Sequence, residues 1–386
     1  MMRHTREKSR VTIFSQWFVR ITLGGFLLTA IFANYMANEL PIFTQKGGKT
    51  EWPIFHPEKY NNLASISFAD YDRVIYPVIP FNHQYAHNLD ERLVPPGSQT
   101  TRNGMKFKHI LGTDRLGRDV AAGLVFGCRK SIYIAFLSAL ISLLIGMLLG
   151  GAAGYWGNNL KIQSTWYFLI WMLLVIYGIY CVYYDLLPGL LVVILVAFAF
   201  LPNLYFRDEK SKYFRLPADF LVIKLIETIQ SIPGLIILLV VAAIVRSPSL
   251  TLLAVIISLI RWTGFARFIR AEVIKIKARD YITAAKISGL SNWKIATKYI
   301  LPEAFGPLIV VFAFGVSSVI LLESTLSFLG IGLPVNEVTW GTLLGQAKQN
   351  PNAWWLALFP GLCILLLVLS LNLIGDQLKR RFDVRD

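Results

Sequence analysis

The first residues whose types suggest chemistry are Gly47-Gly48-Lys49-Thr50, which imitate the end of a phosphate-binding loop. In such a loop, backbone amides and the lysine cradle phosphate groups, and a further glycine precedes Gly48 with four residues between them. That position holds Phe43, and the segment continues as Glu51-Trp52-Pro53 rather than as a helix. The pattern therefore predicts no nucleotide site here.

A second pattern is the pair His83 and His87, which has the i, i+4 spacing of the zinc ligands in a metalloprotease helix. The residue after the first histidine is the general base in such an enzyme, and here it is Gln84, which cannot accept a proton. Pro80 and Asn82 also favour a loop. We therefore expect a surface histidine pair. The three cysteines lie in or beside apolar runs without metal-ligand spacing, so we expect neither a metal site nor a disulfide.

The composition indicates a protein of the lipid bilayer. Of 386 residues, 55% are hydrophobic and 16% are charged, with a mean hydropathy of +0.54, whereas soluble domains carry about 25% charged residues. The net charge of +15 would suit nucleic acid, but the basic residues cluster in short segments beside apolar runs. That distribution favours the positive-inside pattern of membrane proteins over a nucleic-acid-binding surface.

Apolar runs define the elements that must position any functional residue. A helix needs about 20 mostly apolar residues to cross the hydrocarbon core of a bilayer. Six runs are strong candidates, and two more form an inserted hairpin, so we predict an all-α, polytopic transmembrane bundle with a core of six helices. The core spans are approximately 17–35, 132–155, 221–245, 250–268, 308–329 and 354–374, and the inserted hairpin is 165–183 and 186–204.

Lys and Arg in the short connections set the orientation, because cytoplasmic loops are enriched in them. Threading eight spans places all four basic segments on one side, which predicts cytoplasmic N- and C-termini. No cleavage site is evident after the first apolar run, so we expect it to remain as a span. The basic segments are the N-terminus, 207–215, 261–298 and 379–385.

The opposite side carries one long polar segment, 41–130, which mixes both charge signs with aromatic residues and prolines. We expect a small, loosely structured extracytoplasmic segment with room for short strands. The predicted divisions are 1–40 (cytoplasmic N-terminus and first span), 41–130 (extracytoplasmic), 131–160 (second span), 161–215 (inserted hairpin) and 216–386 (core, with a cytoplasmic connection at 278–302).

One acidic residue, Glu323, falls inside the predicted span 308–329. A charged side chain within a span costs about 2.5–3.5 kcal/mol on insertion scales, so it normally faces the bundle interior or water. Two interpretations remain open. Glu323 lines a translocation path together with Ser324 and Ser327, or it lies near the outer interface, hydrogen-bonded to one of these serines.

The cytoplasmic connection 278–302 has clear start and stop signals for helices. Asp280 is placed to N-cap a first helix, and Gly289 supplies the left-handed residue that ends it. Ser291 caps a second helix, and Pro302 opens the element that follows. The pattern predicts a compact helix–turn–helix on the inner face of the membrane.

Small side chains in this connection, at Ala284, Ala285 and Gly289, would allow another backbone to approach closely. One interpretation is a docking element for a partner protein. The alternative is an ordinary amphipathic loop held at the lipid surface by its lysines. Trp293 would correspondingly be an anchor in a protein contact or an interfacial tryptophan at the headgroups.

The connection resembles the EAA loop of permease subunits of binding-protein-dependent ABC importers, through Thr283-Ala284-Ala285-Lys-Ile-Ser-Gly289 and Tyr299-Ile300-Leu301-Pro302. More narrowly, the chain is similar to the second membrane subunit of the oligopeptide, dipeptide and nickel branch. Thr283 stands where that loop usually has glutamate, and Tyr299 where histidine is frequent, which leaves the strength of coupling open. Other matching motifs are 109–119 (with Gly112, Thr113, Asp114, Gly117, Arg118 and Asp119), 154–157, 231–233, 322–330, 340–341 and 355–361.

The resemblance implies a type I ABC importer permease in a bacterial inner membrane, without catalytic activity or a cofactor of its own. Its partners would be a homologous permease subunit, two cytoplasmic ATPase subunits that bind ATP, and an extracytoplasmic solute-binding protein. Closure of the ATPases would push the connection and rock the bundle between inward- and outward-open states. The implied coupling residues are Asp280, Thr283, Ala284, Ala285, Gly289, Trp293, Tyr299, Leu301 and Pro302.

The alternative function is an autonomous secondary transporter or channel. That class favours internal repeats and buried charged residues in several spans, and few of either are present. Within the importer class, the solute remains open between short peptides, nickel chelates and other small oligomers. The role of the inserted hairpin also remains open.

Overall fold

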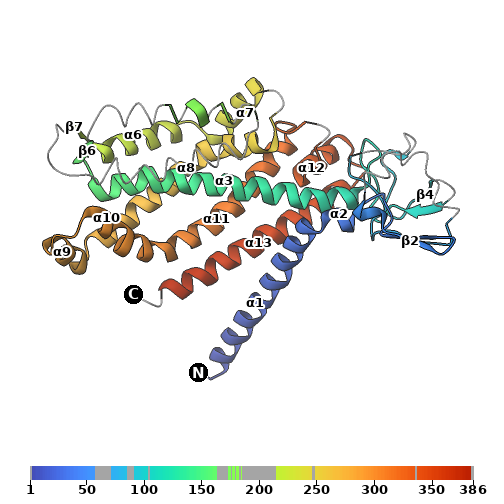
Figure 1. The fold of residues 1–386 in the computed structure, drawn as a ribbon, viewed down its shortest axis with the longest axis horizontal. Helices are drawn as coiled ribbons and strands as arrows, with labels where there is room; N and C mark the ends of the chain where they lie inside the picture. Colours follow the sequence, from blue (N-terminus) through green and yellow to red (C-terminus); the bar gives the residue numbers. More distant parts are fainter. Residues whose placement is uncertain are drawn as a thin grey trace. The chain divides into compact units, whose positions relative to one another are not determined.

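The computed structural model describes residues 2–56, 71–84, 91–102, 105–162, 214–245, 248–334 and 337–383, and a few residues between 173 and 184. The described chain is mostly helical, with a few short strands (Figure 1). It divides into two compact units. Unit 1 comprises Met1–Tyr133 and Ile320–Leu373, and unit 2 comprises Ile134–Val319 and Ile374–Asp386.

Four helices of the described residues are long and apolar enough to cross a membrane. A fifth candidate is the pair α6 (Ala218–Gln230) and α7 (Gly234–Val245), which is bent by 76° at Ser231-Ile232-Pro233. The expected count of eight spans stays a prediction, because most of the expected hairpin lies outside the described residues. The expected first span lies mainly in α1 (Met2–Ile31), which is not among these candidates. The four long helices that meet the requirement are α3 (Val120–Trp156), α8 (Leu250–Lys277), the helix Asn292–Phe328 that ends in α11 (Leu301–Phe328), and α13 (Trp355–Asp383).

Helix α3 begins at Val120 rather than at the expected Ile132. The last part of the segment expected to be loose and extracytoplasmic is therefore the first part of a long helix. The cause is a cap at Asp119, whose Oδ1 accepts a hydrogen bond from the backbone amide of Ala122 at 2.8 Å.

Helix α3 packs against α8 through small residues spaced four apart, which lie on one face of the helix. The hydroxyls of Ser138 and Ser142 donate hydrogen bonds to the backbone carbonyls of Ala254 and Ser258, at 2.8 and 3.2 Å. Glycines continue the stripe, so the two backbones approach closely, as in the small-residue packing of membrane helices. The stripe comprises Ser138, Ser142, Gly146, Gly150 and Gly154.

Gly150 is the tightest point of this stripe. A Cβ atom at Gly150 would lie 2.2 Å from the carbonyl oxygen of Ala266, whereas a Cβ at Gly151 would meet nothing within 4 Å. We expect Gly150→Val to force the helices apart and to lower the free energy of unfolding by about 3 kcal/mol. Gly151→Val introduces the same side chain into open space and serves as the matched control. Equal unfolding midpoints of the two variants in detergent would contradict this packing.

The strands lie in the segment that follows α1 and the short helix α2 (Ala33–Met36). Strands β1 (Phe43–Lys46), β2 (Lys49–Glu51) and β3 (Arg73–Ile75) form an antiparallel sheet in the order β2-β1-β3. Gly47 and Gly48 connect β1 to β2 with φ of 55° and 79°, the geometry of a two-residue hairpin turn. Gly47-Gly48 thus form the turn of a β-hairpin, and Lys49-Thr50 begin its second strand. The other elements here are the 3₁₀ turn Pro53–Phe55 and the antiparallel pair β4 (Gln99–Arg102) and β5 (Met105–Lys108), and a further pair is β6 (Leu160–Ile162) and β7 (Phe214–Leu216).

Candidate functional site

The first candidate site is a helical hairpin in unit 2, formed by α9 (Asp280–Ile287) and α10 (Asn292–Ile295), which lie next to each other (Figure 1). Gly289 adopts a φ of 76° after α9, and Ser291 N-caps α10 by accepting a hydrogen bond from the amide of Lys294 at 3.4 Å. Both local predictions are confirmed. The turn between the helices is therefore set by the left-handed residue and the cap that the sequence supplies.

One prediction about the ends of this hairpin is wrong. Asp280 is the first residue of α9 and not its N-cap; the cap position is Arg279, without a side-chain hydrogen bond. The Asp280 carboxylate still lies in the first turn, where it complements the helix dipole. Pro302 lies in the first turn of α11, as expected, but α11 follows α10 and the π-helical segment η6 (Ala296–Ile300) without a break. The wider π turns relieve the crowding that a proline ring imposes on the preceding carbonyls.

The hairpin packs back onto its own chain. Ile282 and Ile295 are fully buried, and Ala285 is nearly so, in one cluster with Ile276 at the end of α8 and with Ile300. Ala285 is therefore occupied by this packing and does not offer space to a partner, contrary to expectation. Ala284 and Gly289 are exposed.

The outer face of the hairpin exposes large apolar side chains among polar and charged ones such as Lys286 and Lys294. Ile287 is 83% exposed, and Tyr281 and Trp293 are about two-fifths exposed, at 39% and 41%. The sequence-based interpretation missed Ile287. The available signal was its distance of five residues from Ile282, which places the two isoleucines on different faces of α9. We give the name hairpin surface to five of the exposed residues: Tyr281, Thr283, Ala284, Ile287 and Trp293.

Three further residues of the expected coupling set lie at and beyond the end of η6. The Tyr299 ring is half-buried, with its centroid 6.4 Å from that of Tyr281. Leu301 and Pro302 are exposed on the first turn of α11. An ion pair between Arg279 and Glu303 braces the start of α9 against α11.

The second candidate site is the turn before α3 in unit 1, which we call the Asp114–Asp119 turn. One carboxylate oxygen of Asp114 accepts hydrogen bonds from the amides of Leu116 and Arg118, at 2.8 and 2.9 Å. The other accepts from the Arg118 guanidinium, with Nε at 2.8 Å and Nη2 at 2.6 Å. Both side chains are buried. The pair therefore closes the turn around a buried ion pair.

The rest of this motif anchors the turn to its surroundings. Besides capping α3, Asp119 contacts the Nδ1 atom of buried His109 through Oδ2 at 2.8 Å. The carbonyl of buried Thr113 accepts a hydrogen bond from Trp355 Nε1 at 3.0 Å. Gly112 and Gly117 have φ of 79° and 83°, and a Cβ at Gly112 would lie 2.6 Å from the Val94 carbonyl oxygen. The motif thus builds a rigid start for α3 and α13.

His83 is buried in unit 1, contrary to the expectation of a surface residue, and its ring stacks on Phe126 at 3.8 Å. Burial, with the nearby cations Lys130, Arg118 and Arg129, lowers the pKa of His83 to about 4. The ring is therefore neutral at pH 7. The expected partner His87 lies outside the described residues, among which no group of three metal-ligating side chains occurs.

Glu323 lies in α11 within unit 1, and its side chain is fully buried. The hydroxyls of Ser327 and Ser324 donate hydrogen bonds to its two carboxylate oxygens, at 2.9 and 3.4 Å. The hydroxyls of Thr339 and Ser131 lie beside the same carboxylate. Thr339 also N-caps α12 (Trp340–Gln349). This closed arrangement favours the hydrogen-bonded interpretation of Glu323 over a role in lining a path.

Comparison of the sequence with known proteins identifies a family and several relatives. The family described as binding-protein-dependent transport system inner membrane component matches residues 212–384. The dipeptide transport system permease protein of Haemophilus influenzae is 30% identical over 297 residues, which cover 77% of this chain and 80% of the relative. The di/tripeptide transport system permease protein of Pseudomonas aeruginosa is 30% identical over 295 residues, 76% of this chain and 77% of the relative. A dipeptide permease of Lactococcus lactis is 27% identical over 98% of this chain and 88% of its own length. The matched region includes the hairpin surface and all of α11.

Proposed function

Because this chain belongs to the binding-protein-dependent inner membrane permeases of ABC importers, we propose that it forms the translocation path for short peptides. The proposal of a peptide cargo is supported by relatives that are named as dipeptide and di/tripeptide permeases. A multi-pass location in the bacterial inner membrane follows from the family and from the apolar helices.

The family implies ABC ATPase subunits and a solute-binding protein as partners, and we propose a homologous permease as the second membrane subunit. In this arrangement the N- and C-termini are cytoplasmic, and the segment 41–119 faces the solute-binding protein. The basic clusters near both termini support this orientation. The six-helix core with an inserted hairpin at 161–215 is part of the same proposal.

The observation that carries the coupling mechanism is the apolar hairpin surface at the tip of a continuous helix. Ile287 and Trp293 offer exposed apolar side chains for a groove of an ATPase subunit, a helix-in-groove contact. The helix from Asn292 to Phe328 has 37 residues and is therefore about 55 Å long. Movement at the tip is thus transmitted along a single rod into the membrane, without covalent chemistry in this chain.

The test is reconstitution in liposomes with the ATPase subunits, the second permease and the solute-binding protein. We expect uptake of a labelled dipeptide only when ATP and all subunits are present, and co-elution of this chain with an ATPase during purification. Uptake by this chain alone without ATP would overturn the proposal in favour of an autonomous transporter.

A further inference from the structure

Arg261, which the charge pattern grouped with the cytoplasmic basic segment 261–298, lies within the membrane-span candidate α8. It follows Leu250, the first residue of α8, by eleven residues. At about 1.5 Å per residue this amounts to ~16 Å, about half of a hydrocarbon core of ~30 Å. A guanidinium at that depth is costly, so a partner or a functional role is expected for it.

Among the described residues, no neighbour carries a charge that pairs with Arg261. Its Nη2 atom donates a hydrogen bond to the hydroxyl of Ser318 in α11 at 2.6 Å, and its Nε atom is buried without a hydrogen-bond partner. No ion pair in the part of the chain that the structure describes includes Arg261. A hydroxyl satisfies one donor but leaves the positive charge and the remaining donors available to a carboxylate.

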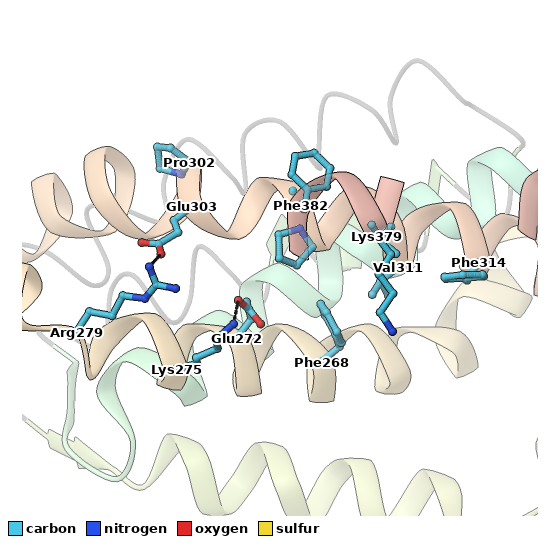
Figure 2. A pocket seen from close by; sticks show the side chains of 13 residues that line it. Phe268, Glu272, Lys275, Arg279, Pro302, Glu303, Val311, Phe314, Lys379 and Phe382 are labelled. Atoms are coloured by element: carbon cyan, nitrogen blue, oxygen red, sulfur yellow. Dashed lines mark ion pairs between the residues drawn. The ribbon is translucent and has the colours of Figure 1, made fainter. Parts of the chain in front are cut away.

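The same faces of α8 and α11 line a cavity of about 590 Å³ in unit 2 (Figure 2). Figure 2 shows the Arg279–Glu303 ion pair toward one end of this cavity and Phe314 at the other. Arg261 precedes the lining residue Phe268 by two helical turns, and Ser318 follows Phe314 by one. Arg261 and Ser318 therefore extend the two lining faces beyond the Phe314 end.

We propose that Arg261 binds the terminal carboxylate of a peptide in transit, while the cavity holds the rest of the peptide. The inference rests on the proposed peptide cargo. Free peptides share a terminal carboxylate whatever their side chains, and a guanidinium binds a carboxylate through two parallel hydrogen bonds. The volume lies within the range of small-ligand sites of about 300–1,000 Å³. Apolar groups such as Phe268 and Phe314 line the end nearer Arg261, and charged side chains line the rest: Glu272, Lys275, Arg279, Glu303 and Lys379.

The experiment compares ATP-driven uptake of trialanine and of trialanine amide by the fully reconstituted importer. The amide lacks the terminal negative charge. The same solute-binding protein is used with every permease variant, so its preference for one peptide over the other does not contribute to differences between variants. We expect Arg261→Gln to lower trialanine uptake about tenfold and to leave uptake of the amide unchanged. Arg261→Lys should retain part of the trialanine uptake. Arg267→Gln removes an exposed arginine from the same helix and should affect both cargoes equally.

A second measurement covers the case in which the solute-binding protein does not deliver trialanine amide to the permease. Saturation-transfer NMR on the purified complex without the solute-binding protein should show contact with trialanine that both amidation and Arg261→Gln weaken. Equal effects on both peptides, or none, would overturn the inference. Loss of complex assembly in Arg261→Gln but not in Arg261→Lys would also overturn it, by assigning the carboxylate to a partner subunit. Absence of peptide uptake by the native importer would instead overturn the proposed function.

Discussion

Replacing Ile287 with aspartate is expected to abolish ATP-driven transport while leaving the chain folded in the membrane. The side chain is 83% exposed, so the substitution removes little internal packing. In the docked state it would bury a carboxylate in an apolar contact, which is strongly unfavourable. A contact of this kind contributes about 2 kcal/mol or more, so we expect about 30-fold weaker association with the ATPase subunits. Co-purification and ATPase-driven uptake measure this directly.

Val78→Asp is the matched control for this prediction. Val78 is 76% exposed and lies in the segment proposed to face outside, so it receives the same charge at a similar exposure. We expect normal association and uptake. Gly289 is a less suitable probe, because its φ of 76° means that any side chain would strain the turn itself. Normal ATPase association of Ile287→Asp would show that docking takes place elsewhere.

The second large effect is expected at the Asp114–Asp119 turn. Asp114→Asn removes the negative charge that pairs with Arg118, whose side chain is 4% exposed, and so breaks a buried ion pair. Breaking such a pair typically costs about 3–5 kcal/mol, so we expect a loss of this size in the free energy of unfolding. Unfolding in detergent, followed by tryptophan fluorescence, measures it.

Two comparisons make this result interpretable. Asp72→Asn alters a carboxylate that accepts a hydrogen bond from the exposed amide of Gly47, and should cost less than about 1 kcal/mol. Combining Asp114→Asn with Arg118→Gln removes both members of the ion pair, so the double variant should lose less than the sum of the single effects. Additive losses would show that the two side chains do not act as a pair.

Features encoded over a few residues were predictable from the sequence. Gly289 and Ser291 define the hairpin turn because a left-handed residue and a side-chain cap act on their immediate neighbours. The apolar runs likewise predicted α8, α11 and α13, since each meets the length requirement of a bilayer by itself.

Features that depend on distant parts of the chain were not predictable. Gly150 is needed because Ala266 of α8 lies too close for a side chain, and that contact is visible only in the folded structure. The partners of Glu323 include a residue of another helix end, Thr339, which no local pattern identifies. The continuation of α10 through Pro302 depends on π turns, for which the sequence has no reliable signal.

Those π turns have a mechanical consequence. A π turn contains about one residue more than an α turn. The helix between the hairpin and the predicted membrane span therefore contains about one residue more than regular α geometry would need. Tightening the segment to α geometry would rotate everything downstream by about 100° without breaking the helix. Under the proposed docking on an ATPase subunit, movement of the hairpin would therefore reach the membrane as a rotation of the helix as well as a shift along its axis.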